Sequence, residues 1–133
     1  MPFRTRPIQM EVLADRMLLN ASPEIVADIN PGASNSGATG LTDVGGTLFF
    51  TANDNLNSYE LWKSDGTENG TEIVKDINPG VGDSFPTFLT NVNGTLFFRA
   101  ENGIHGRELW KSDGTLAGTS MVRAINARLT CSG

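Results

Sequence analysis

The chain has 133 residues, a formal net charge of −5 and one cysteine, Cys131. A length of this order is typical of a single domain with a sizeable core. Its 15 glycines lie between short apolar runs, a composition that favours an all-β fold. The acidic balance, without a basic stripe interleaved with aromatic residues, excludes nucleic acid as the expected partner. One cysteine can form neither an intramolecular disulfide nor a thiolate metal site.

Residues 1–23 form the first segment. Ile8, Val12 and Leu19 stand at helical spacing, which predicts a short amphipathic helix that ends at Pro23. The longest uninterrupted apolar run here covers residues 17–19, too short for an ordinary signal sequence or for a membrane span. The sequence therefore predicts no transmembrane segment in this part of the chain.

Within that segment, residues 13–21 read Leu-Ala-Asp-Arg-Met-Leu-Leu-Asn-Ala. This stretch resembles the LEPR-XLL segment, which stands at the N-terminus of many large bacterial surface or exported repeat proteins. Ala14 and Asn20 occupy positions where that segment has Glu and Ser, so the match is partial. The resemblance implies an exported, cell-surface context, and an ordinary terminal helix is the alternative.

Residues 24–126 are built from a repeat of 48 residues. The eight residues from Glu60 to Thr67 recur, letter for letter, from Glu108 to Thr115. When the stretch from Val26 to Ile73 is aligned with the stretch from Val74 to Met121, more than half of the positions are identical. A third copy begins at Val122 and breaks after Asn126, leaving residues 127–133 as an irregular tail. A fixed internal period must be interpreted before any site is sought.

Each period contains four short strand candidates separated by turn residues such as Asn93-Gly94. The predicted strands are residues 39–44, 47–52, 59–63 and 72–77 in the first repeat and 85–92, 95–100, 107–111 and 120–125 in the second. Four antiparallel strands per period of this length predict tandem blades of the β-propeller type, and a solenoid of stacked sheets is the alternative. Adjacent apolar residues such as Leu109-Trp110 point to opposite faces, so both faces of each sheet need apolar cover.

The repeat resembles the ELWxxDGT repeat family over about three quarters of the chain. The residues that carry the motif are Glu60, Leu61, Trp62, Asp65, Gly66 and Thr67 in the first copy, and Glu108, Leu109, Trp110, Asp113, Gly114 and Thr115 in the second. Proteins of this family are mostly large bacterial surface or secreted proteins with many tandem copies. The resemblance implies a structural role for these residues and gives no indication of an enzyme.

The blade is also similar in layout to the propeller repeats of TolB-type proteins. By that analogy, residues 24–29 are the outer strand of a blade whose other three strands are absent. The expected propeller is thus incomplete, with about two blades, while a closed ring needs at least four. We expect each end blade to leave a large apolar face uncovered and available for self-association.

Four groups of polar residues have both a chemical and a structural interpretation. Asp65 and Asp113 could bind Ca²⁺, but one carboxylate per turn favours plain turn chemistry. Residues 53–57 offer several oxygens yet lack the Gly and Glu of a calcium loop, so a hairpin loop is expected. His105 has no partner for a triad or zinc site and should be an exposed loop residue. Glu60 and Glu108, at equivalent positions, are expected at the sheet rim, bonded to neighbouring turns.

The sequence therefore predicts a non-enzymatic extracytoplasmic repeat protein, at the cell surface or secreted. It would need no cofactor and no metal, and it would present a propeller-type surface to a protein or glycan. Two alternatives stay open: a truncated fragment of a larger repeat protein without activity of its own, and a propeller fragment of a glycan-active enzyme.

Overall fold

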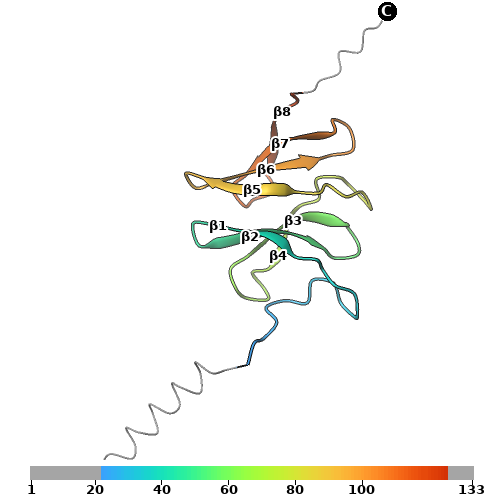
Figure 1. Ribbon diagram of the computed structural model, residues 1–133, viewed down its shortest axis with the longest axis vertical. Helices are drawn as coiled ribbons and strands as arrows, with labels where there is room; N and C mark the ends of the chain where they lie inside the picture. The colour runs from blue at the N-terminus through green and yellow to red at the C-terminus, as the bar shows by residue number, and fades with distance from the viewer. Residues whose placement is uncertain (1–21, 126–133) are drawn as a thin grey trace, which may run out of the picture.

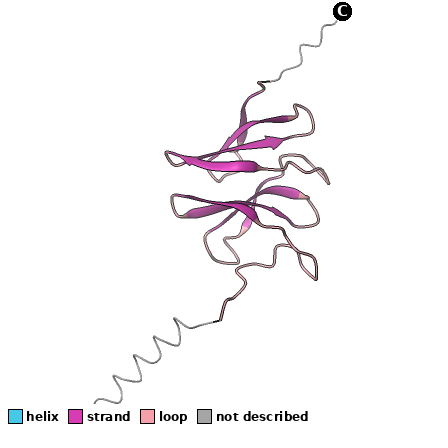
Figure 2. Ribbon diagram, in the orientation of Figure 1, coloured by secondary structure: helices cyan, strands magenta, loops and turns pink. Residues whose placement is uncertain are grey.

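The computed structural model describes residues 22–125, which form two four-stranded antiparallel sheets (Figures 1 and 2). The first sheet has the order β1 (Thr39–Val44), β2 (Thr47–Asn53), β3 (Tyr59–Ser64) and β4 (Glu72–Lys75). The second has the order β5 (Thr87–Val92), β6 (Thr95–Glu101), β7 (Arg107–Ser112) and β8 (Ser120–Arg123). The described residues contain no helix, and hence none able to cross a membrane. The all-β prediction is confirmed, and each strand end lies within two residues of its predicted position.

Local chemistry explains where the strands turn and stop. The β5–β6 hairpin turns at Asn93 and Gly94, which have φ angles of 51° and 85°, as a tight hairpin with two left-handed residues requires. β5 begins two residues later than predicted, after Pro86, because proline has no N–H to give to a ladder. β4 stops at Lys75 because the N–H of Ile77 is donated to the Glu60 carboxylate at 2.9 Å.

Each sheet has two apolar faces. We call the face with which the second sheet packs on the first sheet the leading face, the opposite face the trailing face, and we use the same names for the equivalent faces of the first sheet. The leading face carries Phe50, Ala52 and Trp62 in the first sheet, and Leu96, Phe98, Ala100 and Trp110 in the second. The trailing face carries Phe49, Leu61 and Val74 in the first sheet, and Phe97, Leu109 and Val122 in the second. Residues on one face are 48 positions from their counterparts in the other sheet.

The main core lies where the trailing face of the first sheet packs on the leading face of the second (Figure 1). Leu61 and Leu96 are completely buried there, and Phe98 is 1% exposed. Phe49 closes over Gly114, where an added Cβ would come within 3.1 Å of the phenyl ring. The expectation that both sheet faces need apolar cover is confirmed at this contact.

Four side chains of the first sheet also donate hydrogen bonds across the contact, all to backbone carbonyls of the second. The pairs are Thr42 Oγ1 to Leu89 O (3.2 Å), Thr51 Oγ1 to Pro86 O (2.7 Å), Lys63 Nζ to Gly114 O (2.8 Å) and Lys75 Nζ to Thr119 O (3.0 Å). These bonds fix the register of one sheet on the other, because each donor meets one carbonyl in a direction set by its rotamer.

Two expectations about the ends of the array need correction. Residues 24–29 are not a strand, because no strand of the described chain lies beside them to form a ladder. The leading face of the first sheet is only partly open: Phe50 and Trp62 are 5% and 8% exposed because Ile29 packs against them, while Leu41, which lines the same groove as Phe50, is 64% exposed. The trailing face of the second sheet is uncovered as expected, with Leu109 38% exposed. The predicted N-terminal helix, the LEPR-XLL-like segment and the tail of residues 127–133 lie outside the described residues.

Candidate binding surface

The repeated Glu-Leu-Trp triplet is part of the core. Glu60 and Leu61 are completely buried and Trp62 is 8% exposed; in the second copy Glu108 and Trp110 are 3% and 5% exposed. Leu109 is the exception, because it lies on the uncovered trailing face. Both glutamates were expected at the sheet rim, bonded to neighbouring turns. The bonding is present, since Glu60 accepts hydrogen bonds from Ile77 and Ser84, while the burial of both carboxylates was not predicted.

The Glu60 carboxylate ties the first sheet to the chain that leads into the second. It accepts hydrogen bonds from the N–H of Ile77 at 2.9 Å, the N–H of Asn78 at 3.4 Å and the hydroxyl of Ser84 at 2.7 Å. Burial raises the pKa of Glu60 to about 7, and these three bonds only partly offset that effect. Glu108 repeats the first of these contacts with the N–H of Ile125 at 3.0 Å.

The Asp-Gly-Thr stretch makes a turn, as predicted. Asp65 Oδ1 accepts hydrogen bonds from the Thr67 hydroxyl at 2.6 Å and the Thr67 N–H at 2.9 Å, and Gly66 has a φ angle of 92°. The Thr67 hydroxyl bond lowers the pKa of Asp65 below its usual value. Asp113, Gly114 and Thr115 reproduce this arrangement in the second sheet.

The turn also explains the glycine that follows it in each copy. An added Cβ at Gly70 would overlap the Asp65 carboxylate, and one at Gly118 would overlap the carboxylate of Asp113. The spacing Asp-Gly-Thr-x-x-Gly is thus a packing requirement of the turn.

The loop of residues 53–57 and the loop that carries His105 connect antiparallel strands as hairpin loops. In residues 53–57, Asp54 Oδ1 accepts the N–H groups of Leu56 and Asn57 at 2.9 and 2.7 Å, which folds the loop around one carboxylate. His105 is exposed, as predicted, and its Nδ1 lies 3.1 Å from Asn102 Nδ2. Among residues 22–125, no group of three or more His, Cys, Asp or Glu side chains could hold a metal ion.

Positions where the two repeats differ reveal a surface that the sequence motifs do not mark. Phe85 and Phe88 have φ angles of 46° and 57°, a left-handed conformation that is rare for a bulky residue. Their counterparts 48 residues earlier are Gly37 and Gly40, with φ angles of 59° and 70°. The second repeat thus keeps a glycine conformation while placing two phenyl rings at the surface.

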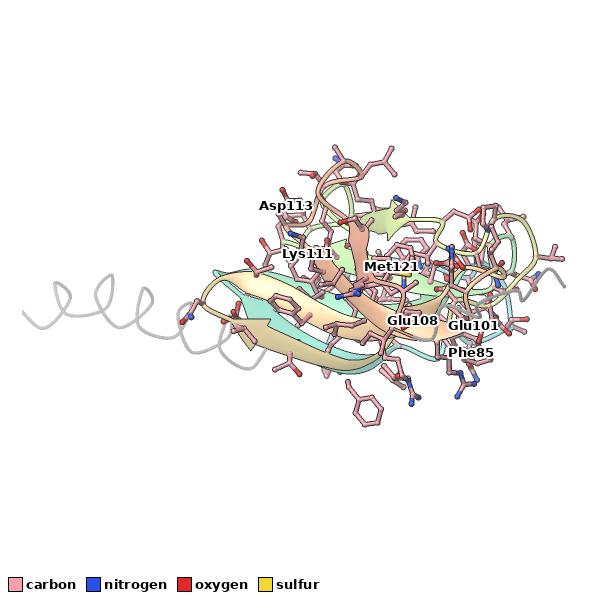
Figure 3. All side chains as sticks on the ribbon, turned by 90° about the horizontal axis from the view of Figure 1, so that it is seen from above. Phe85, Glu101, Glu108, Lys111, Asp113 and Met121 are labelled. Carbon is pink, nitrogen blue, oxygen red and sulfur yellow. The ribbon has the colours of Figure 1, made fainter. Side chains whose placement is uncertain are left out.

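Phe85 belongs to a column of stacked groups at the end of the sheets that carries the β2–β3 and β6–β7 loops. Its ring lies 6.0 Å from the ring of Tyr59 with an interplanar angle of 16°, and the guanidinium of Arg107 lies 6.0 Å from the Phe85 centroid. The Tyr59 ring lies directly against Gly37, because an added Cβ at Gly37 would be 2.7 Å from the Tyr59 hydroxyl. Gly37 is therefore the next residue in this column. In Figure 3, Phe85 and Glu101 lie at the opposite end of the second sheet from Asp113.

Exposed apolar loop residues flank the column. Leu56 is 75% exposed, Val81 87% and Ile104 81%, and Phe85 itself is 42% exposed. The loops that carry them adjoin: Ser58 donates its hydroxyl to Val81 O at 2.9 Å, and an added Cβ at Gly103 would reach the Asn78 amide at 2.8 Å.

We name this surface the loop rim and define it by Leu56, Tyr59, Val81, Phe85, Ile104 and Arg107. The signal that could have found it is the set of differences between nearly identical repeats, which places Phe85 opposite Gly37 and Arg107 opposite Tyr59.

The chain was also compared with known proteins. No family model, no curated protein and no solved structure matches it.

Proposed function

We propose that this chain is a non-enzymatic, extracytoplasmic repeat protein of the ELWxxDGT type that contacts a protein or a glycan through its loop rim. The observation that carries the proposal is the phenyl ring of Phe85, held at a φ angle of 46° where the first repeat has glycine. Strain of this kind persists where the surroundings hold it in place, and it gathers at ligand contacts.

Support for propeller-type blades comes from the way the sheets stack. Each sheet has four antiparallel strands, and the trailing face of one packs on the leading face of the next. Adjacent sheets of a propeller meet face to face in this manner.

Support for a binding role comes from the chemistry of the loop rim. Exposed aromatic and branched apolar groups beside a guanidinium are typical of contact surfaces, because they supply apolar area and directed polar contacts together. The motif carboxylates, by contrast, serve the fold: Glu60 joins the two sheets and Asp65 closes a turn. The surface that is free to meet a ligand is therefore the rim and not the repeated motif.

The proposal is tested with a variant that gives the second repeat the residues of the first, Phe85→Gly together with Arg107→Tyr. Binding of the 133-residue chain is measured to immobilised polysaccharides (alginate, hyaluronan and cellulose) and to immobilised fibronectin and collagen. We expect the wild-type chain to bind at least one probe and the variant to bind it at least about tenfold more weakly.

Leu116→Lys is the matched control, because Leu116 is 66% exposed in the β7–β8 turn, outside the loop rim. This variant should bind as the wild type does. A wild-type chain that binds none of the probes, or equal binding by the rim variant, contradicts the proposal.

A further inference from the structure

The contact between the two sheets is a template for a contact between two chains. Residues that the contact buries in the first sheet are exposed at the equivalent positions of the second. Leu61 is completely buried whereas Leu109 is 38% exposed, and Val74 is 6% exposed whereas Val122 is 46% exposed. The trailing face of the second sheet therefore has the residues of a packed face without the packing.

The leading face of the first sheet has the complementary feature. It holds an apolar groove of about 460 Å³, lined by Leu41, Leu48, Phe50 and Gly66 among others. The counterparts of these four residues in the second sheet are Leu89, Leu96, Phe98 and Gly114, which lie against Phe49 and Lys63 of the first sheet. The groove is thus lined by the same kinds of residue that, in the second sheet, pack against the trailing face of the first sheet.

Residues 24–29 point to the same occupant. Their sequence is that of residues 72–77 except that Ala27 replaces Lys75, and residues 72–75 form β4. Residues 24–29 nevertheless form no strand, and Ile25 and Val26 are 76% and 48% exposed beside the groove. Residues 24–29 thus have the sequence of a strand but no neighbouring strand with which to form backbone hydrogen bonds.

We propose that a second copy of this chain docks head to tail, with the leading face of its first sheet on the trailing face of the second sheet of this copy. In the docked pair, residues 24–27 of the second copy add to β7 and take the place of β8. Strand addition of this kind uses main-chain hydrogen bonds for affinity and side-chain pockets for register. Because the two faces differ, the contact is heterologous and leads to a closed ring or an open filament.

The replacement of β8 is favoured by the cross-strand residue pairs that the incoming strand forms with β7. β4 pairs with β3 so that Lys63 lies opposite Glu72, with Lys63 Nζ 3.1 Å from the carboxylate. The same register places Glu24 of the second copy opposite Lys111, where β8 offers only Ser120. β8 is also short, and Ser120, Val122 and Arg123 in it are exposed. Its remaining residue, Met121, packs against the main core, and Ile25 of the second copy takes that place.

Phe88 adds a contact that the internal template lacks. It is 74% exposed, with the guanidinium of Arg99 4.8 Å from its ring, and its counterpart Gly40 faces Leu89 across the sheet contact. In the docked pair Phe88 faces Leu41 of the second copy, which is 64% exposed. Docking therefore covers two of the exposed apolar side chains with each other.

The first test measures the mass of the full 133-residue chain by light scattering as its concentration is raised. We expect assemblies of two or more copies; closure at four to eight sheets corresponds to about two to four chains. Leu109→Lys, Val26→Lys and Phe88→Gly should each weaken assembly at least about tenfold. Phe88→Gly is decisive because it relieves a left-handed backbone and leaves the monomer folded. Leu116→Lys should assemble as the wild type does.

A wild-type chain that stays monomeric up to about 1 mM overturns the proposal. Equal assembly by Leu109→Lys and Phe88→Gly overturns it too, because docking would then use another surface.

The second test examines the strand exchange by oxidising cysteine pairs in a Cys131→Ser background. Glu24→Cys with Lys111→Cys should give covalent oligomers, while Lys63→Cys with Glu72→Cys should link within one chain. If assembled samples instead link Lys111→Cys with Ser120→Cys inside one chain and give no oligomer with Glu24→Cys, β8 stays in place and the exchange is refuted. These tests need no ligand, so their failure leaves the loop-rim proposal unaffected.

Discussion

Ser84 donates its hydroxyl to Glu60 Oε2 at 2.7 Å, and both side chains are completely buried at the junction of the two sheets. This pair joins β3 of the first sheet to the chain entering the second. Its main cost is the desolvation of the carboxylate, which raises the pKa of Glu60 to about 7 from an ordinary value of 4.5. The junction is therefore sensitive to pH.

Stability should fall as the pH rises from about 4.5 to 7. In that window the folded state holds a proton on Glu60 that the unfolded state has released, so raising the pH favours unfolding. With 1.36 kcal/mol per pKa unit, the loss is at most about 3 kcal/mol. Urea unfolding at a series of pH values measures it. Glu60→Gln should flatten the slope in this window, and an unchanged slope in that variant would assign the effect to another group.

The two tryptophans should respond differently to substitution by phenylalanine. Trp110 Nε1 donates a hydrogen bond to Ala100 O at 3.1 Å, whereas the buried Nε1 of Trp62 has no partner among residues 22–125. Trp110→Phe loses a bond, and Trp62→Phe removes an unsatisfied donor, so the first should cost about 1 kcal/mol more. Denaturant midpoints compare the two variants, and equal losses would contradict the assignment. Trp110→Ala should cost about 3–5 kcal/mol, because the side chain is 5% exposed.

Phe88→Gly should raise the melting temperature of the monomer. The backbone of Phe88 has a φ angle of 57° and its ring is 74% exposed, so glycine relieves strain and loses little burial. The gain is about 1 kcal/mol, or about 4 °C for a chain of 133 residues. Phe88→Ala is the control, since it keeps the Cβ and hence the strain. Calorimetry at low concentration should show stabilisation by glycine alone, and stabilisation by both would refute the strain argument.

Gly70→Ala should destabilise the chain because the new Cβ would overlap the Asp65 carboxylate. The expected loss is about 1–3 kcal/mol, typical of overpacking. A double-mutant cycle with Asp65→Ala isolates the cause, because removal of the carboxylate should restore part of the loss. Strict additivity of the two variants would show that the overlap is not the reason for the glycine.

The strands were predictable because the repeat fixes the turns. Asn93-Gly94 ends one strand and begins the next, and the recurrence of equivalent turns leaves little freedom between them. The two-sided apolar cover was predictable from adjacent residues such as Leu61 and Trp62, which pack in different clusters. The fold was thus predictable from the spacing of the turn residues and from the alternation of side chains between the two faces of each strand.

Other features depend on partners that are distant in sequence. Residues 24–29 and 72–77 are nearly identical, yet only the second stretch contributes a strand, because pairing depends on a neighbour and not on the strand itself. The burial of Glu60 depends on Ser84, which is 24 residues away. The loop rim was not predicted because the repeat motif consists of residues that the two copies share, whereas Phe85 and Arg107 are residues at which the copies differ.

The sheets hold one another through side-chain donors that reach backbone carbonyls, as Lys63 reaches Gly114 O and Lys75 reaches Thr119 O. A carbonyl is present whatever side chain its residue bears, so the acceptor half of each of these bonds depends on the path of the turn and not on the chemistry of its side chains. A gene that duplicates in frame a unit containing Thr42, Thr51, Lys63 and Lys75 therefore supplies the donors of this junction again, and the backbone of the next unit supplies the acceptors. The second repeat has Arg99 and Arg123 in place of Thr51 and Lys75, so a duplicate of that repeat would need other donors at the new junction.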